Sequence, residues 1–222
     1  MVKIGINGFG RIGRLILRAL LENYKGKIQV VGINDLGSIE TNAHLIKYDS
    51  THGILNYEVK TSSDGFKIGD QHIKVFAERD PSKLPWGKIG ADVVLECTGF
   101  FLDKTSAGKH IQAGAKKVII SAPAKEVDFT LVQGVNSKEL KKEHNIISNG
   151  SCTTNCLAPV AMVLEKNFGI TYGYMTTIHS YTGDQKLLDT LHKDLRRARA
   201  TEGSMIPTST GAAKAMSLVL PS

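Results

Sequence analysis

Residues 149–156, NGSCTTNC, hold a cysteine between hydroxyl side chains where a loop leads into an apolar helical pattern. The N-terminus of a helix stabilises a thiolate and lowers the pKa of the thiol, which would make Cys152 nucleophilic near neutral pH. Ser151 and Thr153 can cap this helix and offer hydroxyls to an anion. Cys156 is expected to be a buried, inert thiol one helical turn further on. The segment predicts a nucleophilic cysteine beside an anion site.

A histidine and a second set of hydroxyls follow this segment. His179 comes after residues 171–178, whose alternating pattern predicts a strand. At a strand end its imidazole could meet the helix N-terminus, polarise the Cys152 thiol and then act as acid or base; the alternative is a purely structural histidine. Further hydroxyls and a glycine N–H at another predicted helix start indicate a second anion site, formed by Thr182, Thr208, Ser209, Thr210 and Gly211.

Residues 8–13, GFGRIG, form a G-x-G-x-x-G pattern between a strand pattern and a helical one. In this context Gly8 permits a tight turn, Gly10 lets the backbone approach a pyrophosphate, and Gly13 lets helix and strand pack closely. Asp35 follows 22 residues after Gly13, which suits an acid that binds the adenosine ribose 2′-OH. A carboxylate there would repel a 2′-phosphate, so NAD is favoured over NADP.

Together these groups indicate the oxidation of an aldehyde. The Cys152 thiolate would add to the carbonyl, and His179 would take the hydroxyl proton as hydride leaves for the nicotinamide. A second nucleophile would then cleave the resulting thioester. Two anion sites at helix starts indicate a phosphorylated substrate, with phosphate as that nucleophile.

The surrounding sequence must position these groups, and its first part alternates strand and helix patterns. This alternation predicts an α/β protein with a Rossmann-type, doubly wound, mostly parallel sheet. The strand patterns cover residues 2–7, 28–34, 57–60, 73–76, 93–96 and 118–120, and the helical ones cover 12–21, 41–47 and 103–113.

The pattern changes near Ser148. Beyond it come two helical patterns, 152–168 and 211–220, and a long basic loop over 183–207, a length that favours a functional or interface role. We therefore expect a dinucleotide-binding Rossmann domain over 1–150 and the start of an α+β catalytic domain over 151–222.

Composition narrows the class of protein. The 222 residues include 41% hydrophobic and 22% charged residues, which is typical of a globular chain and excludes global disorder. No apolar run is long enough to span a membrane and no signal peptide is recognisable, so we expect a cytoplasmic protein. The three cysteines exclude a disulfide framework, and no metal site is expected. A net charge of +7 suits phosphorylated small molecules, whereas no specific nucleic-acid motif is present.

Segments along the whole chain resemble glyceraldehyde-3-phosphate dehydrogenase. SCTTNC with the downstream HSYT is the most specific match. The matching segments are INGFGRIGR, IND (33–35), KYDSTHG, ERDPSKLPWG, ECTGFF, KKVIISAPAK, SCTTNCLAP, TTIHSYTGDQ, HKDLRRARA and IPTSTGAAKA.

The resemblance implies the phosphorylating oxidation of D-glyceraldehyde 3-phosphate with NAD and inorganic phosphate, in glycolysis and by a homotetramer. Cys152 would be the nucleophile and His179 its base. The implied cofactor-binding residues are Gly8, Gly10, Arg11, Ile12, Gly13, Asp35, Arg79, Thr98 and Ser121. The implied phosphate-binding residues are Ser151, Thr153, Thr182, Thr210 and Gly211. Loop 183–207 resembles the family loop that packs at the tetramer core.

The chain also departs from the family pattern. Thr190 and Leu191 stand where many members have Leu-Pro near the adenosine ribose, which weakens the expectation of strict NAD use. Family chains are longer, so we expect a chain that lacks its C-terminal third. Two alternatives stay open: an erythrose-4-phosphate dehydrogenase, and a truncated NAD-binding fragment without efficient catalysis.

Overall fold

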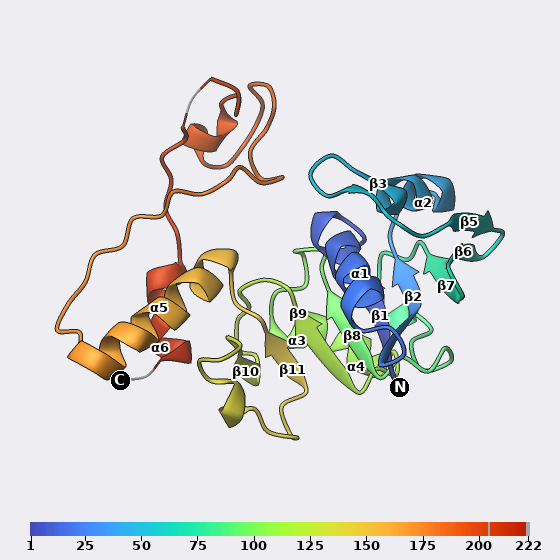
Figure 1. Cartoon of the computed structure of the whole chain (residues 1–222), viewed down its shortest axis with the longest axis horizontal. Helices are drawn as coiled ribbons and strands as arrows, with labels where there is room; N and C mark the ends of the chain where they lie inside the picture. Colours follow the sequence, from blue (N-terminus) through green and yellow to red (C-terminus); the bar gives the residue numbers. More distant parts are fainter. Residues whose placement is uncertain (204, 221–222) are drawn as a thin grey trace. The chain divides into compact units, whose positions relative to one another are not determined.

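The computed structural model describes residues 1–203 and 205–220; Pro221, where we expect the last helix to stop, lies outside the described residues. The chain divides into two compact units, Met1–Ser151 and Cys152–Ser222 (Figure 1). No helix among the described residues is long and apolar enough to cross a membrane.

The first unit is built on a nine-stranded sheet in the order β10-β11-β9-β8-β1-β2-β7-β6-β5. All neighbours are parallel except at one edge, where β6 pairs antiparallel with β5 and β7. The strands are β1 (Val2–Asn7), β2 (Ile28–Asn34), β5 (Val59–Ser62), β6 (Gly65–Ile68), β7 (Gln71–Phe76), β8 (Val93–Glu96), β9 (Lys117–Ile120), β10 (Phe129–Thr130) and β11 (Ile146–Ser148). A separate hairpin joins β3 (Tyr48–Asp49) to β4 (Gly53–Ile54).

This topology confirms the predicted fold class. The chain runs from β1 to β2 on one side and later returns to β8 on the other, which makes the sheet doubly wound. The α-helices of this unit are α1 (Arg11–Asn23), α2 (Ile39–Lys47), α3 (Lys104–Ala107) and α4 (Lys109–Gln112), with short 3₁₀ turns η1 (Pro81–Lys83) and η2 (Ser137–Glu139).

The sheet buries both faces. Ile4 and Ile6 of β1 belong to the same core cluster as Leu17 of α1. A second cluster includes Trp86, which is fully buried against the sheet. A Cβ on Gly5 would lie 2.6 Å from the Trp86 ring, so β1 needs a glycine there.

Several elements of the first unit differ from their prediction. The helix expected over 103–113 is divided into α3 and α4 at Gly108, where a Cβ would lie 2.9 Å from the Lys104 carbonyl oxygen. Because a glycine weakens a helix, the chain turns more easily here than elsewhere in the segment. The predicted strand patterns also do not include the short strands β3, β4, β6, β10 and β11. Ser63, Asp64 and Gly65 are typical turn residues and predict a turn, whereas Gly65 begins β6.

The second unit contains helix α5 (Cys152–Phe168), the 3₁₀ turn η3 (Leu195–Ala198) and helix α6 (Ala212–Val219), and α5 packs against α6. The strand expected over 171–178 is wrong: these residues carry no regular structure, because no described segment of this unit pairs with them. The expectation that Cys156 is buried is also wrong, because the α5 surface that carries it is exposed.

Candidate active site

A cavity of about 530 Å³ opens in the first unit beside the carboxyl ends of β1, β2 and β8. The carboxyl ends of parallel strands are where α/β sheets bind ligands. Five predicted cofactor residues line it: Gly8, Gly10, Asp35, Arg79 and Thr98. The sequence reasoning did not predict Asn7, Asn34, Leu36, Glu78, Cys97, Phe100 and Phe101, which also line it.

The three glycines of the loop have different surroundings. Gly8 has φ +89°, and a Cβ there would lie 2.7 Å from the Thr98 backbone nitrogen. A Cβ on Gly13 would lie 2.3 Å from the Gly8 carbonyl oxygen, so Gly13 sets how closely α1 approaches the loop. Gly10, in contrast, has no atom within 4 Å of the position of a Cβ and leaves a space at the start of α1.

Asp35 connects the end of β2 to this loop. One carboxylate oxygen accepts a hydrogen bond from the Phe9 N–H at 2.9 Å, and the other accepts one from the Gly37 N–H at 2.9 Å. Helix α1 has no side-chain cap at Gly10 in the described structure, so its first N–H groups are available to an anion. An open glycine, an uncapped helix start and a carboxylate on one cavity wall fit a dinucleotide.

The other predicted cofactor residues do not line this cavity. The Arg11 side chain forms an ion pair with Asp49, and Ile12 is half exposed on α1. Ser121 follows β9, and its N–H donates to the Glu96 carbonyl oxygen at 2.9 Å. Their expected roles toward the cofactor stay predictions.

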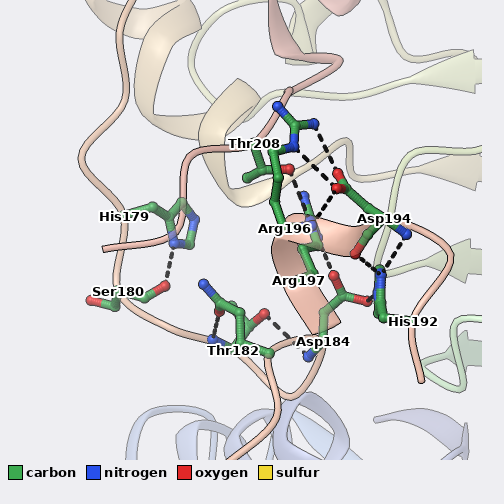
Figure 2. Close-up of polar contacts among 10 residues, drawn as sticks. His179, Ser180, Thr182, Asp184, His192, Asp194, Arg196, Arg197 and Thr208 are labelled. Carbon is green, nitrogen blue, oxygen red and sulfur yellow. Dashed lines mark hydrogen bonds and ion pairs between the residues drawn. The ribbon is translucent and has the colours of Figure 1, made fainter. Parts of the chain in front are cut away.

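The second unit brings the two predicted catalytic side chains together. Cys152 is the first residue of α5, and its Sγ lies 3.0 Å from Nε2 of His179. On the other side of the ring, Nδ1 lies 2.6 Å from the Ser180 carbonyl oxygen, as Figure 2 shows. A carbonyl only accepts, so Nδ1 carries a proton and Nε2 is the nitrogen that exchanges a proton with the thiol.

This contact changes the acidity of both groups. Partial burial alone would raise the pKa of Cys152, but the hydrogen bond and the charge of His179 outweigh it and hold that pKa below its ordinary value. The Ser180 carbonyl, together with Cys152, raises the pKa of His179. Each shift favours the thiolate–imidazolium pair, the form in which a cysteine attacks a carbonyl.

The predicted phosphate residues occupy turns and helix starts. Thr153 follows Cys152 in α5 and hydrogen-bonds to it. The Thr182 N–H donates to Gln185 Oε1 at 2.6 Å within its own turn. Thr210 accepts from the Ala212 N–H at 3.2 Å, and Gly211 is the N-cap of α6. Ser151 ends the first unit, directly before α5.

A polar cluster that the sequence reasoning did not predict organises loop 183–207 (Figure 2). The Asp184 carboxylate contacts His192 Nε2 at 3.3 Å and forms an ion pair with Arg197. Arg197 Nε in turn donates to Thr208 Oγ1 at 2.9 Å. These contacts connect both ends of the loop to its middle. In the sequence, only the high density of charged residues in this loop indicates such a cluster.

Comparison with known proteins agrees with the motifs. Residues 2–104 match the family model for the NAD binding domain of glyceraldehyde 3-phosphate dehydrogenase, and residues 151–222 match the model for its C-terminal domain. The first match confirms NAD as the cofactor of the glycine-loop domain.

Curated relatives match almost the whole chain. Glyceraldehyde-3-phosphate dehydrogenase of Xanthobacter flavus is 59% identical over 220 residues, which are 99% of this chain and 66% of that protein. The Geobacillus stearothermophilus enzyme of the same name is 59% identical over 99% of this chain and 65% of its own length. The chain thus spans about two thirds of the length of these relatives. The two domain matches and this identity show that the chain belongs to the glyceraldehyde-3-phosphate dehydrogenase family.

Proposed function

We propose that this chain takes part in the phosphorylating oxidation of D-glyceraldehyde 3-phosphate with NAD and inorganic phosphate, which gives 1,3-bisphosphoglycerate. The observation that carries the proposal is the 3.0 Å contact between Cys152 Sγ and His179 Nε2 in a chain of this family. Family membership supports the identity of the substrate and the product, and the contact supports the roles of nucleophile and base.

In the proposed reaction the thiolate of Cys152 attacks the aldehyde carbon and forms a carbon–sulfur bond. As this bond forms, the imidazolium of His179 donates its Nε2 proton to the carbonyl oxygen, which becomes a hydroxyl. Nε2 then takes this proton back as hydride leaves the carbon, so that the oxygen can re-form a carbonyl. NAD, when bound, supplies the hydride acceptor for this oxidation. A phosphate oxygen then attacks the thioester carbonyl, and the carbon–sulfur bond breaks to release Cys152 as a thiolate.

The positions of the hydroxyl residues support two phosphate sites. We assign Ser151, Thr153, Thr210 and Gly211 to the attacking phosphate, because three of them lie at the starts of α5 and α6 and Ser151 directly precedes α5. Thr182 is assigned to the phosphate of the substrate. We also infer that loop 183–207 takes part in a homotetramer, because it exposes the large apolar side chains Leu187, Leu188 and Leu191. The cytoplasmic location and the absence of a specific nucleic-acid partner stay predictions.

The variant Cys152→Ser tests the proposal. NADH formation is followed at 340 nm with glyceraldehyde 3-phosphate, NAD and phosphate, and NAD binding is measured by titration calorimetry. We expect the variant to lose turnover and to bind NAD as the parent chain does. Cys156→Ser is the matched control because it removes an exposed thiol one turn away.

Each outcome is informative. A Cys152→Ser chain that still oxidises the aldehyde would contradict the assignment of the nucleophile. A parent chain that binds NAD but shows no turnover would favour the alternative of an NAD-binding fragment. Turnover that is faster with erythrose 4-phosphate, or that needs no phosphate, would favour the other alternative.

A further inference from the structure

A carboxylate is buried behind the wall of the NAD-binding cavity. Glu96 is the last residue of β8 and is 1% exposed, and it does not line the cavity. A charge in such a place is costly unless hydrogen bonds replace its water. Glu96 has no part in the reaction proposed above, so its burial needs another explanation.

Four donors surround the Glu96 carboxylate. Oε2 accepts from Asn7 Nδ2 and from His110 Nε2, the latter at 3.0 Å. Oε1 accepts from the Thr98 N–H at 2.7 Å and from the Thr98 hydroxyl. A charged acceptor with this set of partners is fully satisfied without solvent.

Trp86 and Phe100 fix the direction of these hydrogen bonds. The indole N–H of Trp86 lies 3.0 Å from His110 Nδ1, and because an indole only donates, Nδ1 must accept. His110 is therefore neutral with its proton on Nε2, where it donates to Glu96. The Thr98 hydroxyl accepts the Phe100 N–H at 3.1 Å, so its own proton points to Glu96.

The partners of Glu96 extend around the cavity. Asn7, at the end of β1, uses its Oδ1 to accept from Asn34 Nδ2 at 2.7 Å. Asn34, at the end of β2, also accepts the Glu78 N–H at 2.8 Å. Asn7, Asn34, Glu78 and Thr98 all line the cavity. One buried carboxylate thus orders side chains and backbone from four neighbouring strand ends.

We propose that Glu96 is a positioning residue for NAD: through Thr98 and Asn7 it holds the cavity wall in the binding conformation before the cofactor arrives. The proposal rests on the proposed function only in taking NAD as the ligand. A preordered wall binds more tightly because its ordering cost is met during folding and not during binding.

The variant Glu96→Gln tests this role with little change in shape. In either orientation its amide NH₂ faces existing donors, either those of Asn7 and His110 or the Thr98 N–H. We expect the Kd for NAD to rise about tenfold, because hydrogen bonds to a buried charge are lost. Without NAD, amide hydrogen exchange in residues 97–101 should become about tenfold faster, while exchange in β1 and β2 stays slow. Glu143→Gln, the same change at an exposed site between β10 and β11, should match the parent chain.

A merely structural role predicts a different result. It would lower the urea midpoint of Glu96→Gln, followed by the emission of Trp86, the only tryptophan, and leave the Kd and the exchange of 97–101 unchanged. That result would overturn the proposal. A parent chain that does not bind NAD would contradict the proposed function, whereas the exchange of 97–101 would still test Glu96.

A second pair of variants decides the question if Glu96→Gln does not fold. His110→Phe removes one donor from Glu96, and His110→Gln keeps a donor and an acceptor at that position. His110 does not line the cavity, so it can affect NAD binding only through its hydrogen bond to Glu96. We expect His110→Phe to weaken NAD binding and His110→Gln to restore it, and equal binding by both variants and the parent chain would overturn the proposal.

Discussion

Gly13 offers a direct test of how the glycine loop is built. Replacing it with alanine places a Cβ 2.3 Å from the Gly8 carbonyl oxygen and 3.1 Å from Cγ2 of Ile6. Gly8 cannot move away freely, because its N–H donates to the Asn34 carbonyl oxygen at 2.8 Å. The clash must therefore move the start of α1 away from the glycine loop. The cofactor is expected to bind where these two elements meet.

Two opposing terms set the size of the effect. Alanine is favoured over glycine within a helix by about 1 kcal/mol. Overpacking a tight site costs about 1–3 kcal/mol or more, and a contact with backbone at 2.3 Å belongs at the upper end. The clash should win by about 2 kcal/mol, which lowers the Tm of a domain of this size by about 4–8 °C.

Gly10→Ala is the matched comparison, because nothing lies within 4 Å of its Cβ position. Gly10 has φ −69° and ψ −160°, which alanine adopts, so the Tm should fall little. Its methyl group should instead fill the space through which the backbone approaches a pyrophosphate, and raise the Kd for NAD about tenfold or more. Thermal unfolding and NAD calorimetry on both variants measure the two effects separately.

Gly13→Ala should thus lower mainly the Tm, and Gly10→Ala should raise mainly the Kd for NAD. A Gly13→Ala chain with an unchanged Tm and Kd would mean that α1 and the loop are not held together by close contact. A Gly10→Ala chain that binds NAD as the parent does would mean that the pyrophosphate does not approach Gly10.

Three further predictions concern charged groups. Iodoacetamide should alkylate Cys152 at lower pH in the parent chain than in His179→Asn, because His179 lowers the pKa of the thiol. Mass spectrometry of the peptides identifies the alkylated cysteine. Cys97 should stay unmodified, because burial raises its pKa to about 11. Asp35→Ala should bind NAD about tenfold more weakly and lose its discrimination against NADP, measured by calorimetry with both nucleotides. The N–H of His52, together with Thr51 and Arg11, lowers the pKa of Asp49 from 3.8 to about 2. This carboxylate therefore stabilises the fold only while it is ionised. The difference in unfolding free energy between the parent chain and Asp49→Asn should be full above about pH 4 and vanish as the pH falls towards 2. A urea midpoint difference that persists at pH 2 would contradict this last prediction.

The parallel core of the first unit could be predicted because its pattern is locally consistent. Continuous apolar runs mark strands buried on both faces, and the predicted bounds of β1, β2 and β8 match the structure. The antiparallel edge could not be predicted as well. Strand β6 begins at a glycine inside a turn signal, and only its pairing with β5 and β7 makes it a strand.

The second unit shows the opposite case. Helix α5 was predictable from its own apolar face, because a helix satisfies its backbone internally. Residues 171–178 alternate as a strand does, but a strand forms only where another backbone pairs with it, and none of the described residues does so here. Local pattern thus predicted the helices of this unit and failed for its extended segment.

In the candidate site, too, the parts formed by neighbouring residues could be predicted, and the parts formed by residues far apart in the sequence could not. The glycine loop and the start of α5 are local motifs, whereas Asn7, Asn34 and Glu96 lie far apart in the sequence and meet only because their strands are neighbours. Each is the last residue of an apolar strand, and side-chain hydrogen bonds connect the three. A buried strand in a parallel sheet can end in a polar side chain when the adjacent strand end offers it a partner. The polar ends of these strands therefore satisfy one another, and the strand order places Asn7 and Asn34 in the cavity wall with Glu96 behind them.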